Sequence, residues 1–116
     1  MNPVQIDVLI NTFLRYDDGT GVVIVAGKGG ERFASRLFTA LRTRGALPDM
    51  IGDDSRMLAE AIKVQDCSSA RRVAVVCVSD LSDDTNKVMR AWQDPHPSNR
   101  LIFRIGNVPE TRVVLC

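Results

Sequence analysis

The architecture of this chain follows from one segment, Val22-Val23-Ile24-Val25-Ala26-Gly27-Lys28-Gly29-Gly30-Glu31-Arg32. Its apolar run, residues 22–26, is typical of a strand that is buried on both faces of a parallel sheet. The glycines behind it predict a tight turn, and the helical pattern that follows predicts a helix from about residue 30. The segment therefore indicates a strand, a turn and a helix N-terminus, in the order typical of α/β domains.

The rest of the chain repeats this alternation of strands and helices. Strands are predicted at residues 72–78, 101–105 and 111–115, and a short one at residues 46–51. We place the short strand at a sheet edge, because Pro48 lacks the N–H that a central strand donates. Helices are predicted at residues 3–16, 30–44, 56–65 and 85–92. We therefore expect one α/β domain over residues 1–116, Rossmann-like and three-layered, with a short, mainly parallel sheet flanked by helices.

Apolar residues at helical spacing predict which face each helix buries. In the first helix they are Val4, Val8, Leu9, Thr12, Phe13 and Tyr16. In the second they are Phe33, Ala34, Leu37, Phe38 and Leu41, and in the third Met57, Leu58, Ala61, Ile62 and Val64. The last helix offers Val88, Met89 and Trp92, and residues 52–55 supply capping side chains for the third.

Composition narrows the functional classes. With 116 residues and 45% hydrophobic residues, the chain is large enough to bury one core. Its net charge of +1 argues against a broad nucleic-acid footprint, although arginine supplies twelve of the fifteen basic residues and favours bidentate binding of carboxylate or phosphate. The three cysteines lie far apart, which favours a reducing cytoplasmic compartment over a disulfide framework or zinc site. We expect no membrane segment and no signal peptide.

The turn at residues 27–30 is the first candidate binding site. Free N–H groups and the positive end of the helix dipole attract anions, and Lys28, Arg32 and Arg36 add cations. Glycine allows the backbone to approach a phosphate closely. The segment contains neither a complete Walker A motif nor GxGxxG, so we expect no ATP hydrolysis and no cofactor. The alternative is a tight turn that carries a solvated lysine.

The second candidate site is Ser79-Asp80-Leu81-Ser82-Asp83-Asp84-Thr85, which follows the apolar strand at residues 72–78. Ligands of parallel sheets bind beyond the carboxyl ends of the strands, where the hydroxyls of Ser79, Ser82 and Thr85 can donate to a phosphate. Helix capping explains the same residues without any ligand. Oxygen ligands from the three aspartates offer a weaker Mg²⁺ alternative, but we expect no bound metal.

Together, the two loops resemble those of the sugar isomerase (SIS) domain family. The resemblance covers about residues 4–105 and rests on the glycine-rich loop at residues 27–30 and the hydroxyl-rich loop at residues 79–85. It implies a phosphosugar-binding domain built on a parallel sheet flanked by helices. We predict that a phosphorylated small molecule, a phosphosugar or a nucleotide, binds to Gly27, Lys28, Gly29, Gly30, Arg32, Ser79, Ser82 and Thr85.

Two other functional classes remain open. No acid–base pair or activated nucleophile is evident, and His96 between two prolines is expected to be an ordinary surface residue, so no catalytic residue is assigned. This absence favours a non-catalytic interaction module or accessory subunit with a protein partner. A third hypothesis is an Alba-like nucleic-acid-binding protein, to which residues 51–62 and the preceding strand, turn and helix are loosely similar; the near-neutral charge argues against it. An exposed sheet edge favours a homo-oligomer or a complex subunit.

Overall fold

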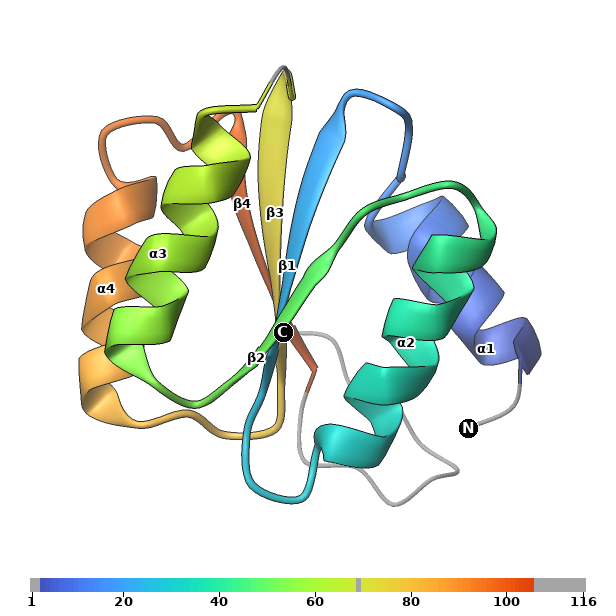
Figure 1. Ribbon diagram of the computed structural model, residues 1–116, viewed down its shortest axis with the longest axis horizontal. Coiled ribbons are helices and arrows are strands. Elements are labelled where there is room, and N and C mark those ends of the chain that lie inside the picture. Colours follow the sequence, from blue (N-terminus) through green and yellow to red (C-terminus); the bar gives the residue numbers. More distant parts are fainter. Residues whose placement is uncertain (1–2, 69, 106–116) are drawn as a thin grey trace.

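The computed structural model describes residues 3–68 and 70–105, and it contains a four-stranded parallel sheet with helices on both faces (Figure 1). The strands are β1 (Thr20–Ala26), β2 (Asp49–Gly52), β3 (Arg72–Val78) and β4 (Arg100–Ile105). The helices are α1 (Pro3–Val8), α2 (Glu31–Thr43), α3 (Ser55–Asp66) and α4 (Asp83–Gln93), and a π-helical segment, η1 (Leu9–Phe13), continues α1. The predicted α/β class is confirmed. The strand predicted at residues 111–115 lies outside the described residues.

The strand order is β2-β1-β3-β4, with every neighbouring pair parallel. The chain passes from β1 to β2 on one side and then crosses to β3 on the other side of β1. The order of strands therefore reverses between β1 and β3, which is the position where open α/β sheets commonly bind ligands. Ala26 and Val78, the last residues of these two strands, are register partners.

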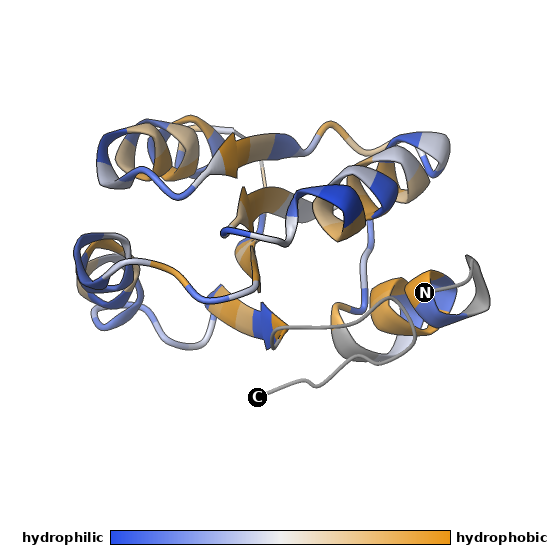
Figure 2. Cartoon of the chain, turned by 90° about the horizontal axis from the view of Figure 1, so that it is seen from below, coloured by the Kyte–Doolittle hydropathy of each residue, from blue (hydrophilic) through white to orange (hydrophobic). Residues whose placement is uncertain are grey.

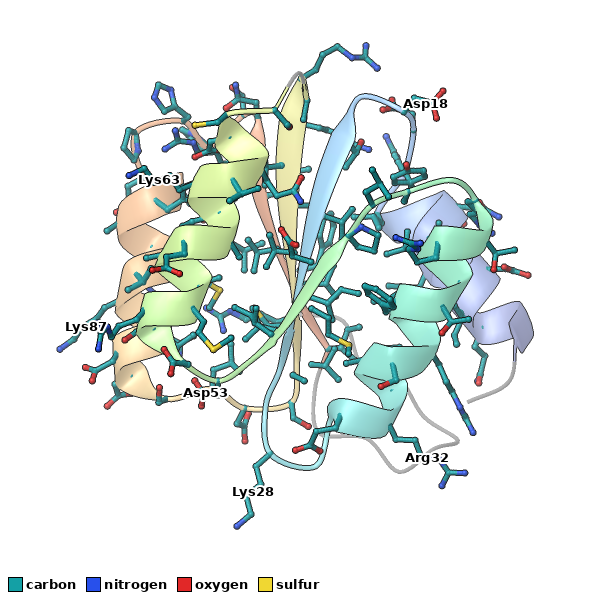
Figure 3. The ribbon with its side chains drawn as sticks, viewed as in Figure 1. Asp18, Lys28, Arg32, Asp53, Lys63 and Lys87 are labelled. Carbon is teal, nitrogen blue, oxygen red and sulfur yellow. The ribbon has the colours of Figure 1, made fainter. Side chains whose placement is uncertain are left out.

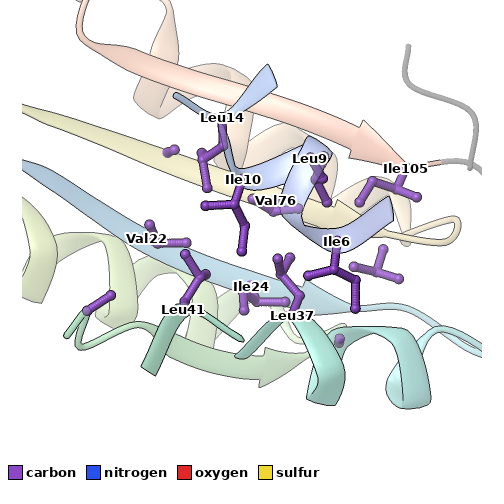
Figure 4. Packing of buried hydrophobic residues seen from close by; sticks show 14 residues of the cluster. Ile6, Leu9, Ile10, Leu14, Val22, Ile24, Leu37, Leu41, Val76 and Ile105 are labelled. Atoms are coloured by element: carbon purple, nitrogen blue, oxygen red, sulfur yellow. The ribbon is translucent and has the colours of Figure 1, made fainter. Parts of the chain in front are cut away.

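The core lies on both faces of the sheet because successive residues of a strand point to opposite sides. Val22 and Ile24 of β1 pack with α1, η1 and α2, whereas Val23 and Val25 pack with α3 and α4. Figure 4 shows the first of these clusters, and Figure 2 shows the hydrophobic residues concentrated in the strands and in the helix faces turned toward them. The continuous apolar runs of β1 and β3 are thus explained by burial on two sides.

The first helix differs from its predicted form. It changes to π-helix at Leu9, and the N–H of Leu14 donates to the carbonyl oxygen of Leu9 at 2.9 Å. The predicted inward residues Val8 and Thr12 are exposed. Leu9 is buried as predicted, and Ile6, Ile10 and Leu14, which were not predicted, are buried with it. The prediction was wrong because apolar residues form two overlapping stripes on this segment, and only contact with the sheet distinguishes them.

The third helix buries a narrower face than its pattern indicated. Leu58, Ala61 and Ile62 are buried as predicted, but Met57 and Val64 are 50% and 62% exposed. The prediction was wrong for these two residues because α3 lies beside β2, which is the edge strand that Pro48 predicted. No further strand covers that flank in the part of the chain that the structure describes.

Candidate functional site

The carboxyl end of β1 leads into the four-residue turn predicted at residues 27–30. The N–H of Gly30 donates to the carbonyl oxygen of Gly27 at 2.9 Å, and Gly29 has φ +83°, as a type II turn requires at its third position. Lys28 lies at the tip and its side chain points away from the body of the protein (Figure 3). The turn is therefore compact, and Lys28 is its exposed cation.

This turn packs directly against the loop that follows β3. The N–H of Gly27 donates to the carbonyl oxygen of Val78 at 2.7 Å. A Cβ atom on Gly27 would lie 2.4 Å from the carbonyl oxygen of Asp80, and one on Gly30 would lie 2.7 Å from that of Val78. Gly27 and Gly30 thus allow a backbone contact that any side chain would prevent. The two loops are therefore in direct backbone contact at the switch point.

Two of the three predicted hydroxyl residues, Ser82 and Thr85, contact a carboxylate that the sequence did not assign to the site, that of Asp53. The N–H of Ser82 donates to Asp53 at 2.8 Å, the Ser82 hydroxyl donates at 3.0 Å, and the Thr85 hydroxyl donates at 2.5 Å. Ser79 is buried with φ +70°, and its N–H donates to the carbonyl oxygen of Ile105 at 3.0 Å. The N-terminus of α4 therefore already holds an anion, the Asp53 side chain. Whether these hydroxyls bind an external ligand stays a prediction.

Asp53 joins the loop after β2 to the loop after β3. Burial alone would raise the pKa of this carboxyl, but the hydrogen bonds from Thr85 and Ser82 outweigh burial and lower the pKa. The next residue, Asp54, caps α3, because its side-chain carboxylate accepts hydrogen bonds from the N–H groups of Arg56 and Met57. Two successive aspartates after a strand are one more than a helix cap requires, and this was the available sequence signal.

Replacement of Asp53 by alanine is expected to lower the free energy of unfolding by about 1–2 kcal/mol at neutral pH, because three hydrogen bonds to an exposed carboxylate are lost. Since the folded pKa lies below the unfolded value of about 3.9, this stabilisation is present above that pH and is lost as pH falls through the folded pKa. Urea titrations of both proteins at several pH values measure the difference. A difference that stays constant into strong acid would contradict the assignment.

The N-terminus of α2 differs from those of α3 and α4. Side chains of Asp54 and Ser82 cap α3 and α4, whereas Gly30 provides no side-chain cap for α2. The first-turn N–H groups of α2 therefore lack a side-chain acceptor from their cap residue, beside the positive end of the helix dipole. Arg32 is exposed in the same turn, but its side chain points away from Lys28 (Figure 3).

An open depression of about 450 Å³ lies beside this turn, at the carboxyl ends of β1 and β2. It is lined by Ala26, Lys28, Glu31, Ser35, Met50, Ile51, Gly52, Asp53 and Met57. Polar side chains come from the turn and α2, and apolar side chains come from β2 and α3. Lys28 and Asp53 lie at this end of the sheet, while Asp18 and Lys63 lie at the other (Figure 3). The depression therefore combines one cation, Lys28, and two carboxylates, Glu31 and Asp53, with the apolar side chains of Met50, Ile51 and Met57.

Neither Cys77 nor His96 lines this depression. Burial raises the pKa of the Cys77 thiol to about 11, against an opposing effect of Arg104, so this thiol is not a nucleophile at neutral pH. His96 is exposed, as predicted, and precedes β4 at the opposite end of the sheet. Among residues 3–68 and 70–105, no cluster of three or more His, Cys, Asp or Glu side chains is arranged to hold a metal ion.

Comparisons of the chain with protein-family models, curated proteins and solved structures give no match. The resemblance to the sugar isomerase domain therefore stays a prediction. Within the described residues, no helix has both the length and the apolar character needed to cross a membrane.

Proposed function

We propose that this chain binds a phosphorylated small molecule at the depression beside the β1–α2 turn. The observation that carries the proposal is the juxtaposition of Lys28 and the uncapped start of α2 with a hollow of about 450 Å³. A phosphate beside Lys28 would gain a charge-assisted hydrogen bond, worth about 1.5–3 kcal/mol, together with the attraction of the helix dipole. The proposed site is smaller than the one predicted from sequence, because the hydroxyls of Ser82 and Thr85 already bind Asp53.

The apolar wall favours a nucleotide over a phosphosugar. Met50 and Met57 are 41% and 50% exposed, and both line the depression together with Ile51. Methionine sulfurs pack favourably against aromatic rings, whereas a sugar would leave its hydroxyls facing apolar side chains. A base against Met50 and Met57, with its phosphate near Lys28, matches both sides of the depression.

Two carboxylates in the same depression set a limit on affinity. Asp53 is held by three hydrogen bonds, which disperse its charge toward α4. Glu31 lies in the first turn of α2 and opposes an anion beside Lys28. We therefore expect modest affinity, and we propose binding without turnover.

Free Cys67 and Cys77 fit the reducing cytoplasmic setting expected from the sequence.

Replacement of Lys28 by alanine is expected to weaken nucleotide binding about tenfold, equivalent to about 1.4 kcal/mol. Thermal shifts would be measured with AMP, adenosine, ribose 5-phosphate and inorganic phosphate. Ligand at about 100 times its Kd adds roughly 2.7 kcal/mol of stability, which gives a visible shift. AMP should stabilise the protein more than adenosine or ribose 5-phosphate does. Only AMP has both a base to pack against Met50 and Met57 and a phosphate to lie near Lys28.

The matched control is Lys87→Ala, which removes the same charge from an exposed site on α4. It should leave binding unchanged. Equal AMP affinity for the Lys28 variant and the natural protein, or no shift with any of these probes, would refute the proposal.

A second candidate function is protein–protein interaction, which is favoured by a specific observation. Four large apolar side chains on or near β2 are exposed: Leu47, Met50, Met57 and Val64. Exposed apolar groups beside a sheet edge are typical of interaction surfaces.

A further inference from the structure

The two edges of the sheet differ in their protection against pairing. β4 carries two charged residues, Arg100 and Arg104, which donate to the carbonyl oxygen of Trp92 at 2.7 Å and to Asn86 at 2.8 Å, whereas β2 carries only one. Charged side chains on an edge strand discourage the addition of another strand. The charged residue of β2 is Asp49, and its carboxylate is held by the Gln65 amide at 3.0 Å. The outer side of β2 therefore presents backbone N–H and C=O groups with no partner strand among the described residues.

On one face of the sheet, the flank of α3 nearest this edge carries two exposed apolar side chains, Met57 and Val64, and the exposed Glu60 lies between them in the sequence. Met57 lines the depression with Met50 of β2, while Asp66 on the other flank accepts a hydrogen bond from Trp92 of α4. Val64 follows Met57 by seven residues, which places the two side chains on the same flank two turns apart. Both are at least half exposed.

On the opposite face, the flank of α2 nearest the edge carries one charge of each sign. Glu31 lines the depression beside Met50. Arg42 follows Glu31 by eleven residues, so it lies within about 20° of the same direction and about 16 Å farther along the helix. Both side chains are exposed. The separation is too large for a salt bridge within one chain.

We propose that the β2 edge is the interface of a two-fold symmetric dimer of this chain, with β2 of each copy antiparallel to β2 of the other. A two-fold axis perpendicular to the sheet brings α2 beside α2 on one face and α3 beside α3 on the other, with directions reversed. Glu31 of each copy then faces Arg42 of the other, and Met57 of each copy faces Val64 of the other. The Glu31–Arg42 pair and the Met57–Val64 pair are each formed twice in this arrangement.

The dimer interface shares Glu31 and Met57 with the depression of the proposed nucleotide site. Lys28 points along the strand direction beyond the carboxyl ends, so pairing along β2 leaves it accessible (Figure 3). Arg42 of the second copy would offset the charge of Glu31, which opposes an anion beside Lys28. The test of the dimer needs no ligand, so its result does not depend on the outcome of the binding experiment.

A charge exchange tests the interface directly. Light scattering after size-exclusion chromatography should show a particle of two 12.8-kDa chains for the natural protein. Glu31→Arg and Arg42→Glu should each shift the protein to a monomer, because each places like charges opposite one another twice. A mixture of the two variants should dimerise again, since every facing pair is then opposite in charge.

A second pair of variants tests the apolar side. Val64→Glu should weaken the dimer. The matched control is Val8→Glu on α1, because Val8 is also exposed, to 46%, but lies outside the proposed interface. Circular dichroism confirms that each variant is folded. A natural protein that is monomeric at every soluble concentration overturns the proposal and leaves the edge to a different protein. Dimers that persist in all three interface variants overturn it as well, because the interface then lies elsewhere.

Discussion

Gly27→Ala is expected to lower the free energy of unfolding by about 3 kcal/mol, the sum of overpacking and the loss of one hydrogen bond. The new Cβ atom would lie 2.4 Å from the carbonyl oxygen of Asp80, a backbone atom that cannot rotate away. The turn would have to move, and the hydrogen bond from Gly27 to Val78, now 2.7 Å, would lengthen or break. For a chain of this size the melting temperature should fall by about 10 °C.

Two other glycines provide the comparison for this experiment. A Cβ atom on Gly52 meets nothing within 4 Å, so Gly52→Ala should change stability by less than about 0.5 kcal/mol. Gly29 also faces open space but has φ +83°, so Gly29→Ala should cost about 1–2 kcal/mol through backbone strain alone. Thermal or urea unfolding of the three variants gives the ranking. Equal losses for Gly27 and Gly52 would show that the contact between the two loops is not rigid.

Leu58→Ala should cost about 3 kcal/mol because Leu58 is fully buried against the sheet and its removal leaves a cavity. Its neighbour Met57 is 50% exposed on the flank of α3 beside β2, so Met57→Ala should cost less than about 1 kcal/mol. Urea unfolding of the two single variants, at a protein concentration low enough to keep the chain monomeric, measures the difference. A larger loss of stability for Met57→Ala than for Leu58→Ala would mean that α3 buries the side that carries Met57, which would contradict the structure.

These variants also distinguish an effect on stability from an effect on nucleotide binding at the carboxyl ends of the strands. Leu58 has no contact with the depression, so Leu58→Ala should leave nucleotide affinity unchanged below its melting temperature. Met57→Ala should reduce that affinity with little loss of stability, because Met57 lines the depression. Gly27→Ala is expected to affect both properties, since the turn that presents Lys28 is displaced.

Much of the fold could be predicted from local pattern. The apolar runs of β1 and β3 and the glycine-rich turn identified the centre of the sheet, and Pro48 identified its edge. These signals are local because burial on both faces requires consecutive apolar residues, and because proline and glycine act on their own backbone. The buried faces of α1 and α3 were predicted only in part, since each segment has more apolar residues than one face can bury.

The order of residues alone was sufficient for the α/β class, the turn at Gly27–Gly30 and the helix that begins at Glu31, because period, glycine and proline act over a few neighbouring positions. Folding in three dimensions settled the rest. It placed Asp53 against Ser82 and Thr85, 29 and 32 residues away, and it brought Gly27 and Gly30 into contact with the loop after β3. It also left Met57 and Val64 beside an open edge. Such contacts depend on strand order and on how loops pack, and no local pattern encodes either of these.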